Sequence, residues 1–96
     1  MLREDTMEKG TAAAIRRFPD WSLEIRRLAL SDASFRSLCD DFGDAEEALA
    51  RWRQAPAADG AVRTTEYATL VEELAAEIAG IVLRRREAHA DHTSSI

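Results

Sequence analysis

The chain has 96 residues, 46% of them apolar and 32% charged, and it carries a net charge of −5. A chain of this length forms one domain at most, and it is too apolar for a wholly disordered protein. The negative charge argues against a nucleic-acid-binding protein, because such proteins usually present a basic face to the phosphates. Ala, Arg, Glu and Leu are abundant while Gly and Pro are few. This composition favours helices and predicts an all-α protein.

The start of the chain and its single cysteine indicate the compartment. The segment MLREDTMEKG contains three acids and no apolar run, so it does not resemble a secretory signal. No stretch approaches the ~20 apolar residues that are needed to span a bilayer. Cys39 is the only cysteine, which excludes an internal disulfide and fits a reducing environment. We therefore expect a cytoplasmic protein without a membrane segment.

The two ends of the chain have weak structural signals. Residues 1–17 are predicted to form a weakly ordered segment, because Gly10 interrupts a helix-compatible run and little apolar surface anchors it. Residues 89–96 are polar and are predicted to form a tail. The helical domain is accordingly expected to span residues 18–88.

A short helix is predicted over residues 19–30. Pro19 suits a first helical turn, where its missing N–H group is not needed. The apolar residues Trp21, Ile25 and Leu28 then share one face of this helix.

The segment SDAS at residues 31–34 allows two interpretations. Ser31 or Asp32 is a suitable N-cap for a new helix, which favours a break at this point. One unbroken helix is the alternative, because apolar residues recur every seven positions across the segment. These residues are Trp21, Leu28, Phe35, Phe42 and Leu49.

Two long helices are predicted over about 33–54 and about 64–88, and the second is expected to be capped by Thr64 or Thr65. The Pro- and Gly-containing segment between them is predicted to be a loop, so the helices should pair as an antiparallel hairpin. Apolar residues recur in both helices at heptad spacing and predict a continuous seam. The seam residues are Phe35, Leu38, Phe42, Leu49, Trp52, Tyr67, Leu70, Val71, Leu74, Ile78 and Ile81.

Placing Trp52 opposite Tyr67 sets the register of the hairpin. The same register brings glutamates of the first helix, such as Glu46, near glutamates of the second, such as Glu73, and we expect these side chains to splay into solvent. A two-helix hairpin has one interface and leaves apolar residues uncovered. Either the short helix covers them, or two chains dimerise into a four-helix bundle. We expect a homo-oligomer, most simply a dimer.

Candidate metal ligands are few and scattered. His89 and His92 lie three residues apart near the end of the chain, and Glu46, Glu73 and Glu77 belong to an acidic belt on the two helices. Helical di-iron proteins use a Glu-x-x-His pattern, and this sequence contains none. We therefore expect no metal and no other cofactor.

Cys39 and the runs of arginines do not indicate a catalytic or nucleic-acid-binding site. Cys39 lies beside the seam and precedes Asp40 and Asp41, and neighbouring carboxylates raise the pKa of a thiol and suppress its reactivity. The arginines at residues 84–86 suit the carbonyl end of a helix. No Gly-rich phosphate loop or nucleophile elbow occurs, so no catalytic residue is predicted.

The Phe18-Pro19 pair and the spaced apolar residues that follow it resemble the YdcH-like family of small bacterial proteins of unknown function. The resemblance covers residues 18–83 and implies a helical hairpin, with no assigned catalytic residue. It begins with the Phe-Pro pair at residues 18–19 and includes the second-helix segment EYATLVEELAAEI. The matching positions are Phe18, Pro19, Ile25, Leu28, Asp32, Phe35, Leu38, Ala45, Glu46, Leu49, Leu70, Glu73, Leu74, Glu77 and Ile78.

Three functions are compatible with this sequence. The leading hypothesis is a non-enzymatic helical protein that acts by self-association or by binding a partner helix, because the heptad seam is its strongest pattern. The second is a metal-binding or metal-storage hairpin whose carboxylate and histidine ligands come from several chains. The third is a nucleic-acid or transcription accessory factor. The cellular process is not indicated by the sequence.

Overall fold

The computed structural model describes residues 8–55 and 59–94, and every regular element in these ranges is helical. This confirms the all-α class predicted from composition. In chain order the elements are α1 (Lys9–Arg17), the 3-10 turn η2 (Pro19–Trp21), α2 (Ser22–Ser31), α3 (Ala33–Arg53) and α4 (Asp59–Ser94).

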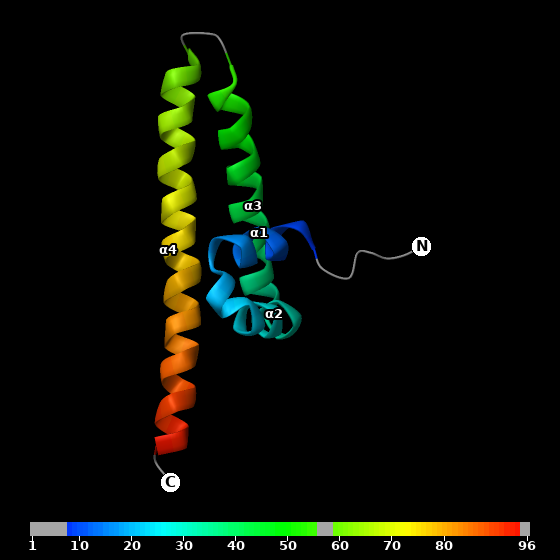
Figure 1. Cartoon of the computed structure of the whole chain (residues 1–96), viewed down its shortest axis with the longest axis vertical. Helices are drawn as coiled ribbons and strands as arrows, with labels where there is room; N and C mark the ends of the chain where they lie inside the picture. Colours follow the sequence, from blue (N-terminus) through cyan, green and yellow to red (C-terminus); the bar gives the residue numbers. More distant parts are fainter. Residues whose placement is uncertain (1–7, 56–58, 95–96) are drawn as a thin grey trace, which may run out of the picture.

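Helices α3 and α4 form the predicted antiparallel hairpin and run side by side along the long axis of the molecule (Figure 1). Helices α1 and α2 pack on the half of the hairpin where α3 begins, and α1 contacts mainly α3. The other half of the hairpin therefore consists of α3 and α4 alone.

The chain breaks between α2 and α3, which decides between the two interpretations of the SDAS segment. Asp32 has an extended backbone, and its side chain accepts a hydrogen bond from the N–H group of Phe35 at 3.1 Å. The guanidinium of Arg36 donates to the carbonyl of Ala29 near the end of α2. Asp32 thus caps the start of α3, and Arg36 satisfies a free carbonyl at the end of α2.

Helix α4 is longer at both ends than the predicted helix. It begins at Asp59, so Thr65 lies inside it and its hydroxyl donates to the carbonyl of Ala61 at 3.1 Å. At the other end α4 continues to Ser94 and includes most of the predicted tail, while residues 95–96 lie outside the described residues. No Gly or Pro follows Gly80, and residues 83–89 are exposed but mostly good helix formers, so the helix is not interrupted where the sequence turns polar.

The prediction of a weakly ordered start is wrong for residues 9–17, which form α1, while residues 1–7 lie outside the described residues. Ala13 and Ala14 are 2% and 0% exposed in the core. The helix crosses α3 at Gly10, where a Cβ atom would lie 2.5 Å from the Cα atom of Asp40. Gly10 therefore permits close helix packing rather than interrupting a helix.

A second glycine lies on the other side of the same crossing. A Cβ atom on Gly43 of α3 would lie 3.2 Å from the Cα atom of Gly10. The sequence indicates Gly43 as a weak point of its helix, because glycine lowers helix stability by about 1 kcal/mol relative to alanine. In the fold, the lower helix stability at Gly43 is offset by the close contact between the backbones of α1 and α3, which is possible because neither glycine has a side chain.

Helices α1 and α2 cover much of the apolar surface that a bare hairpin leaves exposed. Val82 of α4 is 0% exposed. Phe18 and Trp21 are partly buried against the core, with their rings stacked 5.1 Å apart. The covering short helix that the sequence allows is therefore present, and α1 adds to it.

We predict that Gly10→Ala destabilises the protein by about 1–3 kcal/mol, because the added methyl group overlaps the Asp40 backbone and α3 has to move. Urea denaturation measures the change. Gly80→Ala is the matched control, since its nearest heavy atom outside the helix backbone is the flexible tip of Arg84 at 3.3 Å. The control should gain about 0.5–1 kcal/mol from helix propensity. Equal stability of the Gly10→Ala and wild-type proteins would contradict the close crossing.

Candidate functional site

The seam residues of α3 lie where the heptad pattern places them. Phe35, Phe42 and Leu49 are 1%, 0% and 8% exposed, and Leu38 and Trp52 are partly buried. Cys39 joins them in the core. The α3 half of the seam is thus mostly interior.

The seam residues of α4 divide between the interior and the surface. Val71 and Ile78 are buried, whereas Tyr67, Leu74 and Ile81 are partly buried and Leu70 is 38% exposed. The buried stripe of α4 contains Val71, Ala75, Ile78 and Val82. It is rotated from the predicted seam toward α1 and α2, because these helices add a second surface to be covered. Ala75 was missed by sequence reasoning, although its helical spacing from Val71 and Ile78 is a usable signal.

The exposed part of the seam borders an open groove between α3 and α4, with a volume of about 430 Å³. Ala45 and Ala48 contribute only methyl groups on the α3 side, so this side of the hairpin is hollow. Leu70 contributes the most exposed apolar side chain on the α4 side. We call this the α3–α4 groove. Its lining residues are Asp41, Asp44, Ala45, Ala48, Arg51, Tyr67, Leu70 and Leu74.

The α3–α4 groove lies on the side of the hairpin that α1 leaves uncovered. Gly43 and Glu47 of α3 face α1, through Gly10 and an ion pair with Lys9 respectively. Residues one position further along a helix are rotated by about 100°. The alanines that line the groove, such as Ala48, therefore point away from α1.

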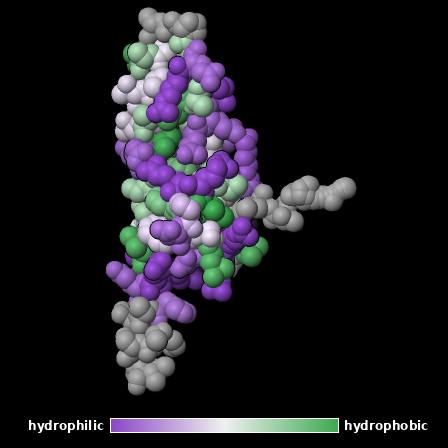
Figure 2. All heavy atoms as spheres, in the orientation of Figure 1, coloured by the Kyte–Doolittle hydropathy of each residue, from purple (hydrophilic) through white to green (hydrophobic). Residues whose placement is uncertain are grey.

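Surface hydrophobicity elsewhere is more dispersed. Figure 2 shows separate apolar patches among hydrophilic residues on the face toward the viewer. The exposed large apolar residues of the described chain are Leu23, Leu30, Val62, Leu70 and Leu83. Of these, Leu70 is the one that borders the α3–α4 groove.

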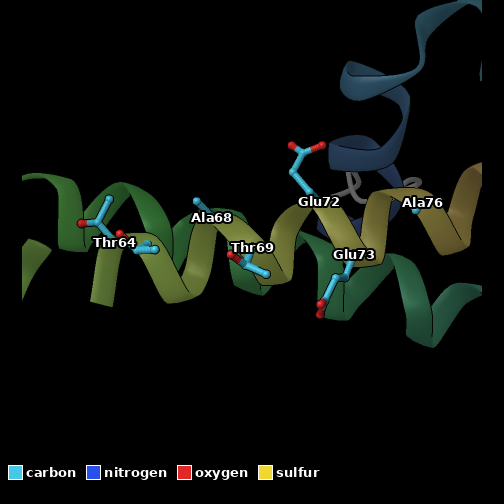
Figure 3. A pocket seen from close by; sticks show the side chains of 7 residues that line it. Thr64, Ala68, Thr69, Glu72, Glu73 and Ala76 are labelled. Carbon is cyan, nitrogen blue, oxygen red and sulfur yellow. The ribbon is translucent and has the colours of Figure 1, made fainter. Parts of the chain in front are cut away.

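A second depression is lined by α4 alone and is correspondingly open (Figure 3). Figure 3 shows Glu72 and Glu73 pointing to opposite sides of the helix, so their carboxylates do not form a pair. The lining residues are Thr64, Thr65, Ala68, Thr69, Glu72, Glu73 and Ala76. One helix cannot enclose a small molecule, so this surface has no geometry for a buried ligand.

Two cations of α1 form ion pairs with glutamates of α3 and α4. These glutamates belong to the group that the predicted register brings close together in the hairpin. Arg17 donates two hydrogen bonds to Glu72, at 2.8 and 3.0 Å, and these bonds lower the pKa of the Glu72 carboxyl. Lys9 forms an ion pair with Glu47. The side chains of Glu47 and Glu72 remain 42% and 65% exposed, in line with the expectation that these glutamates face solvent, and α1 adds counterions that the bare hairpin lacks.

Two carboxyl groups of α3 have raised pKa values. Burial is the main cause for Asp40, and the negative charges of Glu8, Asp44 and Asp41 add to it while Arg36 opposes it. Burial also raises the pKa of Glu46, against the opposing charges of Arg16 and Arg17. Both groups lie where α1 packs on α3, so their environment follows from that packing.

The candidate metal ligands are not brought together. Among the residues whose side chains the structure describes, no three His, Cys, Asp or Glu side chains lie close enough to hold a metal ion. Glu46 lies on α3, whereas Glu73 and Glu77 lie on α4. His89 is an exposed residue of α4. His92 also belongs to α4, but its side chain lies outside the described part. A metal site assembled from several chains stays a prediction.

Cys39 is 0% exposed in the core. Burial raises the pKa of its thiol to about 12, and the neighbouring charge of Asp40 adds a smaller contribution. The sequence predicts the direction of this shift from the carboxylates, whereas the fold shows that burial is the larger cause.

Comparison with known proteins finds no matching family model, no similar curated protein and no similar solved structure. The resemblance to the YdcH-like family therefore stays a prediction. Among the described helices, none combines the length and the apolar character that a membrane span requires.

We predict that the Cys39 thiol does not react with an aromatic disulfide reagent at pH 8 while the protein is folded. Both its burial and its pKa of about 12 keep the reactive thiolate absent. Unfolding in urea should expose one thiol per chain, and the change in absorbance measures it. Rapid reaction of the folded protein would show that α1 opens readily.

We predict that Asp40→Asn raises the melting temperature at pH 7, because it removes a charge that burial disfavours. The gain should shrink as the pH falls toward the raised pKa of Asp40. In that range the folded wild-type protein binds the proton more readily than the unfolded chain does, so its own stability recovers. Thermal denaturation between pH 7 and pH 4 measures the difference, and a gain that does not depend on pH would contradict this explanation.

Proposed function

We propose that the protein is a non-enzymatic helix-binding module that self-associates through the α3–α4 groove, or binds a partner helix there. In the self-associated form two hairpins make a four-helix bundle with coiled-coil-like packing. The observation that carries the proposal is Leu70, which is 38% exposed beside the small residues Ala45 and Ala48. A helix laid in the groove would cover this side chain.

The energetics favour such an occupant. Two helices share one interface, so the half of the hairpin beyond α1 and α2 has no third element to complete its core. Covering a large aliphatic side chain contributes about 1.5–3 kcal/mol when it passes from full exposure to full burial. The partly buried side chains of Tyr67 and Leu74 add to this. Small helical domains commonly gain their missing core from a second chain.

A binding role is better supported than a catalytic one by what the site contains. The lining of the α3–α4 groove combines small and apolar residues with three charged ones, Asp41, Asp44 and Arg51. Charged residues at the edge of an apolar strip are typical of helix–helix interfaces, where they select partners and orientation. A cytoplasmic location belongs to the same proposal and is supported by the single, buried thiol of Cys39.

We predict that Leu70→Glu weakens self-association at least about tenfold, because it places a charge in the proposed interface and removes apolar area. Sedimentation equilibrium measures the dissociation constant. Leu70 is partly exposed on an outer face of α4, so the folded monomer should retain its helical circular dichroism.

Leu30→Glu is the matched control for this experiment. Leu30 is 84% exposed on α2, on the far side of the break from the groove, and the same change there should leave association unaltered. A wild-type chain that stays monomeric and binds no helix, or an equal effect of both changes, would refute the proposed role of the groove.

A further inference from the structure

We infer that the occupant of the α3–α4 groove is a second copy of this chain, with its α3 packed antiparallel against α3 about a two-fold axis perpendicular to the helices. In this arrangement Arg51 of each copy lies beside Asp44 of the other. The inference rests on the proposed function and adds the identity and orientation of the occupant.

The charges along the α3–α4 groove are ordered. Asp41 and Asp44 lie toward one end and Arg51 toward the other, and all three are residues of α3. Asp44 and Arg51 are seven residues apart, which is about 10 Å along a helix. Among the described residues Arg51 has no ion-pair partner in its own chain. The rim of the groove therefore carries an acidic end and a basic end that are both available to another molecule.

A second copy supplies the complementary charges without any further requirement. A two-fold axis perpendicular to α3 reverses the direction of the helix, so the basic end of one rim meets the acidic end of the other. The contact occurs twice because the interface is isologous. A foreign helix would need the same charges in the opposite order, whereas a copy provides that order by symmetry.

The small residues of α3 fit the same axis. The midpoint between Asp44 and Arg51 falls at residues 47 and 48, so Ala48 lies next to the axis. Ala48 is 7% exposed and contributes only a methyl group to the groove. A short side chain at the centre of a crossing lets two helices approach closely. Leu70, on the neighbouring helix, then covers the side of this contact.

The other two-fold arrangement brings like charges together. With the axis parallel to the helices, α3 would face α4 of the second copy. Because α3 and α4 are antiparallel (Figure 1), Asp41 and Asp44, which begin the α3 lining of the groove, lie nearest Leu74, which ends its α4 lining. Leu74 is preceded by Glu73 and followed by Glu77 on the same helix. The acidic end of the rim would therefore meet an acidic part of α4, which disfavours this arrangement.

The experiment tests the charge pairs in trans. Arg51→Glu and Asp44→Arg are made separately, and each variant alone should associate about tenfold more weakly than wild type, since each homodimer contains two repulsive contacts. Both positions are exposed, so circular dichroism should show the wild-type helix content. An equimolar mixture should form a heterodimer of nearly wild-type affinity, because a reversed pair and a native pair are then both attractive.

Native mass spectrometry distinguishes the heterodimer from the two homodimers by mass, and sedimentation gives the affinities. A statistical mixture with no preference for the heterodimer would overturn the antiparallel arrangement. If the wild-type chain associates and Leu70→Glu weakens it, that result would leave the proposed function standing. If the wild-type chain does not associate at all, both the inference and the self-association fail. If it binds an unrelated helix instead, the identity of the occupant is wrong.

Discussion

The close crossing of α1 and α3 at Gly10 and Gly43 is the contact on which the rest of this structure depends. No side chain separates the two backbones there, so α1 lies directly on α3. That position brings Lys9 to Glu47 and Arg17 to Glu72. The hairpin has an acidic middle, and α1 supplies the cations that compensate it. A helix held further away would leave those glutamates without counterions and the alanines of α1 without a core.

The same crossing decides which surface stays open. Because α1 approaches α3 from the side of Gly43, it covers that side of the hairpin and leaves Ala45 and Ala48 facing away from it. Together with the partly exposed Leu70, these residues border the α3–α4 groove. The proposed interface is thus a consequence of asymmetric coverage. Helix α1 covers one side of the hairpin within the chain, and we propose that a second copy covers the other side.

The fold was largely predictable because its strongest signals are local. Heptad spacing located both long helices, and the candidate N-caps Ser31 and Asp32 favoured a break before α3, which the structure places at Asp32. The errors have tertiary causes. Gly10 was interpreted as an interruption because its neighbour Asp40 is 30 residues away in the chain. The end of α4 was predicted too early because polarity suggests a tail, whereas a helix without breakers needs no burial to continue.

For the candidate site, the sequence determined which residues are apolar and at what spacing, and hence that Leu70 and Leu74 belong to the apolar face of α4. Only the tertiary structure decided which part of that face is covered. Val82 is fully buried while Leu70 remains 38% exposed, although both are apolar residues of one helix. The physical reason is that the burial of a side chain depends on which other helices pack against it. Here the neighbours are α1 and α2, whose position is set by a backbone contact between two glycines, and no periodicity encodes that contact.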